Sequence, residues 1–159
     1  MNGNVSDAQL VTALDRKVYY DRLAQDNGFN YVTASSDDGV VTFSGETRNE
    51  FERDYALWLV DNTAGVKDVI DNINVAPASI FDDRIRITAL RAIYRDPVLS
   101  RYAIDPAKPI RIVVDHGHLT LYGTVASTLE KQVAGLRASQ VFGAFTVETT
   151  CRWKGSRSS

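Results

Sequence analysis

Three arginines at helical spacing are the side chains of this sequence best suited to bind a ligand. Arg84, Arg91 and Arg95 are 7 and 4 residues apart, so they fall on one face of a helix predicted for residues 82–95. A guanidinium group can donate two parallel hydrogen bonds to a phosphate group. The opposite stripe of this helix is apolar and is expected to face the core.

Apolar and aromatic residues extend this basic face. Ile87 and Tyr94 are expected on its flank, and Arg101 and Tyr102 follow just beyond the helix. Tyrosine is favourable at a headgroup boundary, and a basic amphipathic helix suits an anionic bilayer surface. An alternative is a solvated basic face, or one that docks on an acidic part of the chain. The predicted lipid-contacting residues are Arg84, Ile87, Arg91, Tyr94, Arg95, Arg101 and Tyr102.

A second group that could do chemistry is the cluster Asp115-His116-Gly117-His118. Two imidazoles and a carboxylate could bind zinc. No fourth ligand is evident nearby, and the corresponding segment of the first half, Asp37 to Val40, is an ordinary turn. We therefore predict no metal site and no cofactor.

The sequence gives no basis for assigning a reaction. Its only two histidines lie at one turn, and it contains neither a G-x-S-x-G nucleophile motif nor a G-x-x-x-x-G-K-[ST] phosphate loop. Adjacent Asp37 and Asp38 precede a glycine, which is typical of a turn. We predict that the protein is not an enzyme.

Charge is distributed unevenly along the chain. Residues 1–78 carry a net charge of −7, with 6 Lys+Arg and 13 Asp+Glu, whereas residues 79–159 carry +5, with 12 and 7. A basic half favours an anionic partner. The total charge of −2 and the lack of a G-x-x-G clamp between helices argue against nucleic acid.

No apolar run approaches the length of about 20 residues that spans a bilayer, so any membrane contact is expected to be peripheral. A signal peptide is not recognisable in the sequence. The single cysteine, Cys151, excludes an intramolecular disulfide and is expected to be a buried apolar thiol.

The elements that would position these residues follow an α-β-β-α-β order, which occurs twice. The apolar stripe expected for the second helix consists of Phe51, Tyr55, Leu59 and Val60. In the first half the pattern predicts helix 7–23, strands 29–36 and 40–45, helix 49–63 and strand 66–75. In the second half it predicts helix 82–95, strands 109–115 and 118–123, helix 127–141 and strand 144–153.

The second order arises from an internal repeat. The segment from Gly39 aligns without a gap with the segment from Gly117, at a separation of 78 residues, which indicates a duplicated unit. In the first helices, Val11–Leu14 resembles Ile87–Leu90, which places Ala8, Asp15 and Tyr19 opposite the three arginines. On this alignment the fold does not require arginine there.

The repeated motif resembles that of the BON domain family. Gly39-Val40-Val41-Thr42-Phe43-Ser44-Gly45 and Gly117-His118-Leu119-Thr120-Leu121-Tyr122-Gly123 match the family's G-x-V/L-T-F/L-x-G, followed by a helix with E-x-x-x-A and a helix-ending glycine. The resemblance implies an α+β fold of two αββαβ units, each a three-stranded mixed sheet with two helices on one face. The expected boundaries are residues 6–75, a linker 76–80, residues 81–153 and a disordered tail 154–159.

The resemblance also implies a location and a role. Family members are mostly bacterial envelope proteins, and dual-BON examples include an osmotically inducible, stress-response periplasmic protein and outer-membrane lipoproteins. The resemblance therefore implies a periplasmic, non-enzymatic protein that contacts anionic phospholipid surfaces through the first helix of the second unit. The alternative is a chaperone-like or protein-interaction module that supports envelope proteins.

Overall fold

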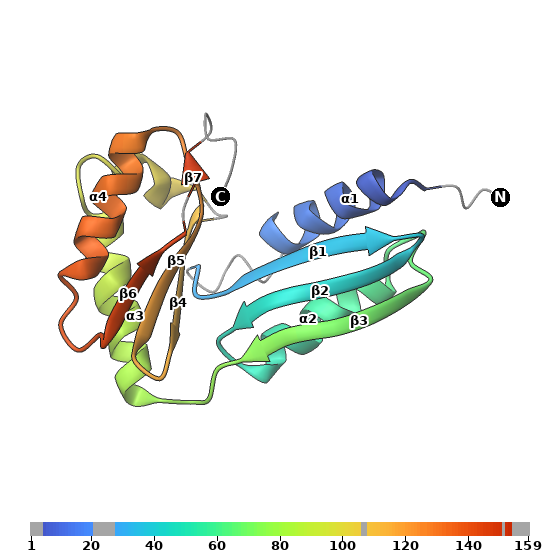
Figure 1. The fold of residues 1–159 in the computed structure, drawn as a ribbon, viewed down its shortest axis with the longest axis horizontal. Helices are drawn as coiled ribbons and strands as arrows, with labels where there is room; N and C mark the ends of the chain where they lie inside the picture. The colour runs from blue at the N-terminus through green and yellow to red at the C-terminus, as the bar shows by residue number, and fades with distance from the viewer. Residues whose placement is uncertain (1–4, 21–27, 106–107, 151, 154–159) are drawn as a thin grey trace.

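The chain forms two units of the same design. The structure is a computed structural model that describes residues 5–20, 28–105, 108–150 and 152–153. The predicted tail 154–159 and Cys151 lie outside the described residues. The first unit contains α1 (Asp7–Tyr20), β1 (Tyr31–Asp37), β2 (Val40–Thr47), α2 (Glu50–Asp61) and β3 (Asp68–Val75), as Figure 1 shows.

The second unit repeats this order with two additions. A 3-10 helix, η2, follows its first helix, and its last strand is divided where the Thr150 amide and hydroxyl both donate to Leu121 O, at 2.8 and 2.7 Å. The elements are α3 (Ile80–Tyr94), η2 (Ser100–Ile104), β4 (Ile110–Asp115), β5 (His118–Val125), α4 (Thr128–Ser139), β6 (Thr146–Thr149) and β7 (Arg152–Trp153). The predicted α-β-β-α-β order is confirmed in both units.

Strand pairing recurs at the predicted separation of 78 residues. In the first sheet β1 pairs antiparallel with β2, and β2 pairs parallel with β3; β4, β5 and β6 do the same in the second. Val32 lies opposite Gly45 just as Ile110 lies opposite Gly123. The β-α-β part of each unit therefore requires a crossover helix that returns over one sheet face.

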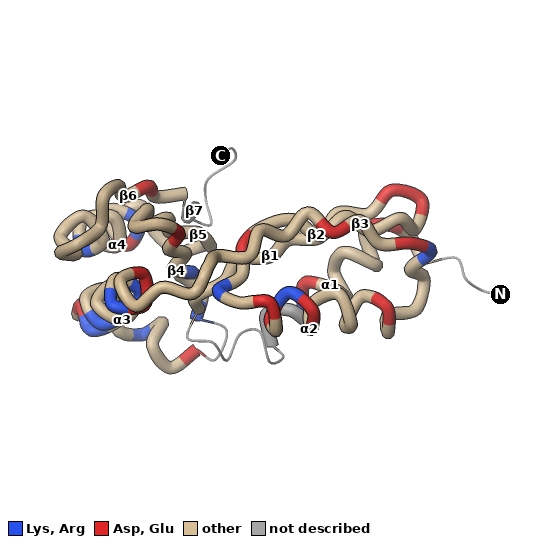
Figure 2. Tube along the Cα trace, turned by 90° about the horizontal axis from the view of Figure 1, so that it is seen from below, with Lys and Arg blue, Asp and Glu red and all other residues tan. Residues whose placement is uncertain are grey.

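Each sheet has its two helices on one face, as predicted. Figure 2 shows α1 and α2 on the same side of the first sheet. Leu14 of α1 and Val60 of α2 are buried against Val41 and Phe43 of β2. In the second unit Ala89 of α3 occupies the equivalent core. Burial of these apolar side chains is the main stabilising contribution to each unit.

The predicted apolar stripe of α2 is partly wrong. Phe51 is 56% exposed, whereas Glu52 and Ala56 are buried beside Leu59. The Glu52 carboxylate faces inward because it accepts a hydrogen bond from the buried Asn30 side-chain amide at 2.8 Å, while Asn49 caps the helix by accepting from the Glu52 amide at 3.0 Å. Phe51 instead begins an outward aromatic ladder with Tyr55 and Trp58, whose successive ring centroids are 6.4 and 5.8 Å apart.

An aspartate at the start of the first helix binds the hairpin turn in each unit. The Asp7 carboxylate accepts hydrogen bonds from the Asp38 and Gly39 amides at 2.9 and 3.1 Å. Asp82 accepts from the His116 and Gly117 amides at 3.0 and 2.9 Å. The central residues of both turns have positive φ, the pattern of a type I′ turn. These two aspartates are therefore structurally equivalent.

This equivalence corrects the predicted alignment of the first helices. Asp7 and Asp82 are separated by 75 residues, not the 76 that relates Val11 to Ile87. With the shift of 75, the buried residues Leu10 and Leu14 correspond to the buried residues Ile85 and Ala89. The helix positions and the strand positions of the repeat therefore have different separations.

A buried network joins the two units. Arg111 of β4 is 2% exposed, and its guanidinium donates to Asn30 O at 2.8 Å and to Asn30 Oδ1 at 2.7 Å. The Asn30 side-chain amide donates to Glu52 Oε1 at 2.8 Å. Tyr31 stacks on Tyr122 with ring centroids 4.4 Å apart. The sheet face that carries Tyr122 therefore packs between the units.

The segment before β1 precedes the strands of the first unit in the chain, but it packs against the second unit. Phe29 is 4% exposed and lies in the second core, with Leu99 and Ile110. The Ile112 amide donates to Gly28 O at 2.7 Å, which extends the edge of β4. The two units are therefore in direct contact and are not joined by the linker alone.

Candidate functional site

The sequence around α3 determines which of its side chains face outward. Ser79 caps the helix by accepting a hydrogen bond from the Asp82 amide at 3.2 Å. Ile85, Ala89 and Ile93 recur at helical spacing and are buried, as predicted. Because this stripe is fixed against the sheet, the opposite stripe of α3 must face solvent.

The outward stripe of α3 alternates isoleucine with arginine. Ile80, Arg84, Ile87 and Arg91 lie 4, 3 and 4 residues apart and are all exposed, and exposed Arg95 continues the row. Ile80 is 73% and Ile87 44% exposed. Within the described residues none of these three arginines makes an ion pair. Figure 2 shows the basic residues of α3 and the predominantly acidic first unit.

The predicted surface position of Tyr94 is wrong. Its side chain is 6% exposed, and its hydroxyl donates to Ile110 O at 2.6 Å and accepts from the Ile110 amide at 3.0 Å. Tyr94 follows the core residue Ile93, at the edge of the helix that turns toward β4. The tyrosine therefore ties α3 to the start of β4.

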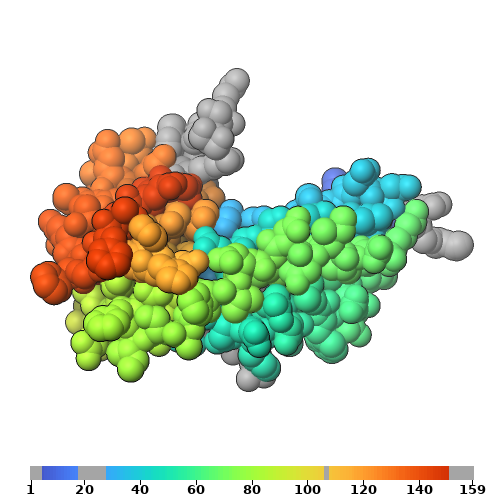
Figure 3. All heavy atoms as spheres, turned by 60° about the horizontal axis from the view of Figure 1, so that its bottom comes forward, coloured from blue at the N-terminus to red at the C-terminus, as the bar shows by residue number. Residues whose placement is uncertain are grey.

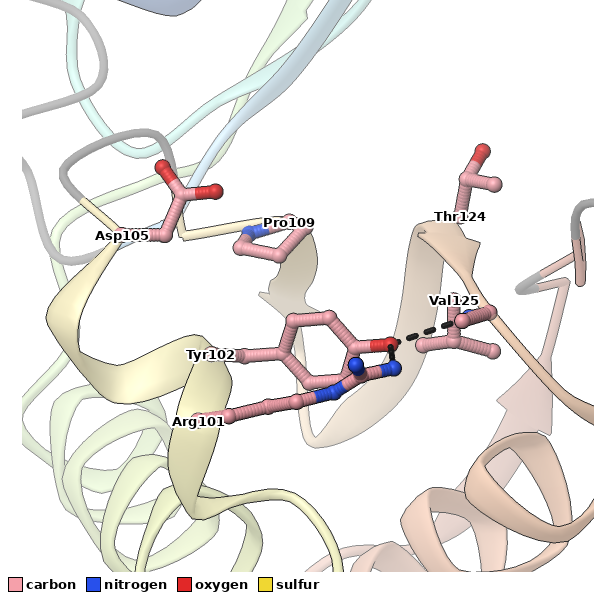
Figure 4. Close-up of a pocket in the computed structure, with 7 residues that line it drawn as sticks. Arg101, Tyr102, Asp105, Pro109, Thr124 and Val125 are labelled. Carbon is pink, nitrogen blue, oxygen red and sulfur yellow. Dashed lines mark hydrogen bonds between the residues drawn. The ribbon is translucent and has the colours of Figure 1, made fainter.

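Arg101 and Tyr102 lie at a different place and already have protein partners. They line a hollow of about 330 Å³ beside β5 and η2, together with Asp105, Pro109 and Thr124 (Figure 4). The Arg101 guanidinium lies 4.8 Å from the centre of the Tyr102 ring and donates to its hydroxyl at 2.9 Å.

Both residues hold the buried carboxylate of Glu130. The Tyr102 hydroxyl donates to Glu130 Oε1 at 2.7 Å, and Arg101 pairs with Oε2 at 2.7 Å. Burial alone would raise the pKa of Glu130, but the hydrogen bonds from Tyr102 and the Ala126 amide and the charge of Arg101 lower it overall. This glutamate stabilises the start of α4, so Arg101 and Tyr102 have a structural role.

Comparison with known proteins identifies the family. The BON domain model matches residues 6–77 and 95–149, which is most of the chain. The chain belongs to the BON domain family. The second match begins at residue 95, so α3 of the second BON unit lies outside it. No curated protein matches the sequence.

Two solved structures of CdsD, a structural protein of the type III secretion system of Chlamydia trachomatis, are similar to this chain. One, of the C-terminal domain, is 12% identical, covers 94% of this chain and 99% of its own, and has a TM-score of 0.32. The other is 12% identical, covers 91% of each chain and has a TM-score of 0.31.

The corrected helix alignment changes the comparison between the two BON units. With a separation of 75, Arg84 corresponds to Gln9 and Arg91 to Arg16, in place of Ala8 and Asp15. Arg16 is exposed on α1. Arg84 is therefore specific to the second unit, whereas Arg91 is not.

Sequence reasoning missed the buried arginine of α3. Arg86 is 2% exposed, pairs with Asp83 at 2.6 Å and donates to Val114 O at 2.7 Å. The i, i+3 spacing of Asp83 and Arg86 was the available signal. Arg86 therefore neutralises one of the two carboxylates in the first turn of α3.

The histidines of the second BON unit also have local partners. His116 Nδ1 lies 2.5 Å from Asp115 Oδ1, and His118 Nδ1 lies 2.6 Å from Thr146 Oγ1. In the described part of the chain, no three His, Cys, Asp or Glu side chains gather as metal ligands would.

Among the same described residues, no helix has the length and hydropathy needed to cross a membrane.

Proposed function

We propose that this BON protein binds anionic phospholipid surfaces peripherally, through the outward stripe of α3. The observation that carries the proposal is the row Ile80, Arg84, Ile87, Arg91 and Arg95, in which exposed arginines alternate with exposed isoleucines. Arginine binds lipid phosphate groups, and each basic residue near an anionic surface contributes about 1 kcal/mol. Isoleucine between them can enter the headgroup region.

The positions of the other predicted lipid-contacting residues favour the outward stripe of α3 as the binding surface. Tyr94 is buried, and Arg101 and Tyr102 are bound to Glu130, so the proposed lipid contacts are reduced to α3 itself. The partner is then a membrane surface of the bacterial envelope, the compartment typical of the family. No reaction is required of the protein in this role.

Vesicle co-sedimentation tests the proposal with a matched control. Arg84→Glu/Arg91→Glu should weaken retention by phosphatidylglycerol-containing vesicles by tenfold or more, since two charges of about 1 kcal/mol each are reversed. Arg16→Glu changes the corresponding exposed position of α1 and should leave retention within about twofold. Equal retention of the wild-type protein by neutral and anionic vesicles would falsify the proposal.

Protein interaction is a second candidate, favoured by the outer faces of α2 and α4. Trp58 is 55% exposed, and its counterpart at the separation of 78, Leu136, is 57% exposed. The repeat thus presents large apolar side chains at one position in both units, where an envelope protein could dock. If this function is correct, Trp58→Ala/Leu136→Ala should abolish suppression of aggregation of a reduced model protein, while Arg84→Glu/Arg91→Glu should not.

A further inference from the structure

A cluster of exposed apolar side chains lies at one end of the second BON unit. Phe142 is 96% and Phe145 79% exposed in the loop between α4 and β6, and Phe81 is 76% exposed in the first turn of α3. Ile80, at 73%, adds the end of the outward stripe. We refer to Ile80, Phe81, Phe142 and Phe145 as the apolar tip.

Backbone contacts bring these two segments together. The Phe145 amide donates to Gly117 O at 2.8 Å, and the Gly117 amide donates to Asp82 Oδ1 at 2.9 Å, directly beside Phe81. A Cβ at Gly143 would lie 3.8 Å from Cγ1 of Ile85, so the loop packs on α3. Figure 1 shows the first turn of α3, the β4–β5 turn and the loop after α4 at the same end of the unit.

The first BON unit shows that the fold does not require these phenylalanines. Phe142 and Phe145 correspond to Ala64 and Lys67, at the separation of 78. The backbone bond is the same, because the Lys67 amide donates to Gly39 O at 2.8 Å. Only the side chains differ, so the aromatic loop is an added property of the second unit.

Charge makes a bilayer the partner that fits the tip. Arg84 lies one helical turn beyond Ile80 on the outward stripe, so the tip continues the basic surface. Three carboxylates nearby have partners within the protein: Asp82 accepts from the turn amides, Asp83 pairs with Arg86, and Asp115 Oδ1 contacts His116 Nδ1. In Figure 3 the surface of α3, in yellow-green, borders the red-orange surface that follows α4.

We propose that the apolar tip inserts into the headgroup and acyl boundary of the same anionic bilayer, with Phe142 and Phe145 as its deepest side chains. The inference rests on the proposed function and adds a second step to it. Arginines of α3 recruit the protein electrostatically, which salt screens. The phenylalanines then hold it by burial of apolar surface, which salt does not weaken.

The test separates the two steps by salt. Wild-type protein should stay on vesicles of phosphatidylcholine and phosphatidylglycerol when salt at about 0.5 M is added after binding. Phe142→Ser/Phe145→Ser should bind normally at low salt but be released by added salt, with retention reduced about tenfold or more. Ile104→Ser is the control, because Ile104 is 87% exposed on η2, which lies at the end of the unit opposite the first turn of α3 (Figure 1). Retention of this variant should match the wild type.

A fluorescence measurement makes the outcome independent of affinity. Relative to the wild type, Phe142→Trp should add a blue-shifted emission with anionic vesicles and quenching by lipids brominated on their acyl chains, whereas Ile104→Trp should add neither.

If the protein binds anionic vesicles but the tryptophan introduced by Phe142→Trp is not quenched, insertion is wrong and the proposed function stands. If it binds no anionic vesicles, the proposed function is wrong as well. If the serine substitutions change only the oligomeric state, the tip is an interface between copies and insertion is again wrong.

Discussion

The two BON units have the same backbone and different surfaces. In both, an aspartate in the first turn of the first helix binds a type I′ turn, a glycine allows two strands to approach, and the first turn of the crossover helix contains a buried glutamate. The first unit is acidic, while the second carries the Ile–Arg stripe and the apolar tip. Shared residues maintain the fold, and residues present in one unit are the ones to test for function.

The largest effect is expected at a shared residue. A Cβ at Gly123 would lie 1.9 Å from Pro109 O, and one at Gly45 would lie 2.0 Å from Tyr31 O; both residues have positive φ. Gly123→Ala and Gly45→Ala should each lower the free energy of unfolding by more than about 3 kcal/mol, because the backbone must shift. Urea unfolding measures this. Gly135→Ala, within α4, should change it by less than about 1 kcal/mol; equal effects at all three glycines would contradict the explanation.

The next largest effect on the free energy of unfolding is expected at Arg111, a residue that the two units do not share. Arg111→Ala removes the guanidinium that bridges to Asn30 and should cost about 2–3 kcal/mol, because buried acceptors lose their donor. Thr33 occupies the same position in the first unit, and Thr33→Ala should cost less than about 1 kcal/mol. Urea unfolding should also become broader or biphasic in Arg111→Ala. A single unchanged transition would show that the units are not coupled through this network.

A pH-dependent effect should follow from the carboxylates of the second unit. Hydrogen bonds from Arg137 and the Val98 amide lower the pKa of Asp96, and the pKa of Glu130 is lowered as described. A carboxyl group whose pKa is lower in the folded state than in the unfolded state stabilises the folded protein. This stabilisation is complete above the unfolded-state pKa of about 4 and is lost as the pH falls through the folded-state pKa. Asp96→Asn should reduce the loss of stability between neutral pH and about pH 3 in acid titrations followed by circular dichroism. An unchanged slope would remove Asp96 from this explanation.

The smallest effect is expected at the stacked tyrosines. Burial, with the negative charge of Glu46, raises the pKa of Tyr122 to about 12. The unfolded chain therefore loses its proton first, and stability should fall as pH rises from about 10 toward 12. Tyr122→Phe should cost about 1 kcal/mol or less at neutral pH and should flatten this alkaline decline. A decline of the same slope in the variant would assign it to another group.

The strand framework was predictable because the repeat carries the same turn in both units. A two-residue turn sets the register of each hairpin, and the parallel strand pairs also recur at the separation of 78 residues. The helix alignment was wrong by one residue because the segments between helix and strand differ in length, so the strand separation of 78 does not determine the helix separation. The turn-binding aspartates reveal the correct separation of 75, which a three-dimensional contact makes visible.

The candidate site was only partly predictable for a related reason. Periodicity placed Ile85, Ala89 and Ile93 in the core and left the arginine stripe outside, as found. It could not distinguish surface Ile87 from buried Tyr94, which lie seven residues apart on the same face, because the burial of Tyr94 depends on its contact with β4. The Arg111–Asn30–Glu52 network depends on how the units dock, and no local pattern encodes that arrangement.

The position of Phe29 has a practical consequence for dissecting the protein. The repeat divides the sequence near residue 78, so an obvious experiment is to express each half separately. A fragment beginning there would lack Phe29 from its core, and Gly28 from the edge of β4. The core of the second unit thus includes a residue from the first half of the sequence, so single-residue changes in the intact protein are the informative way to assign roles to its halves.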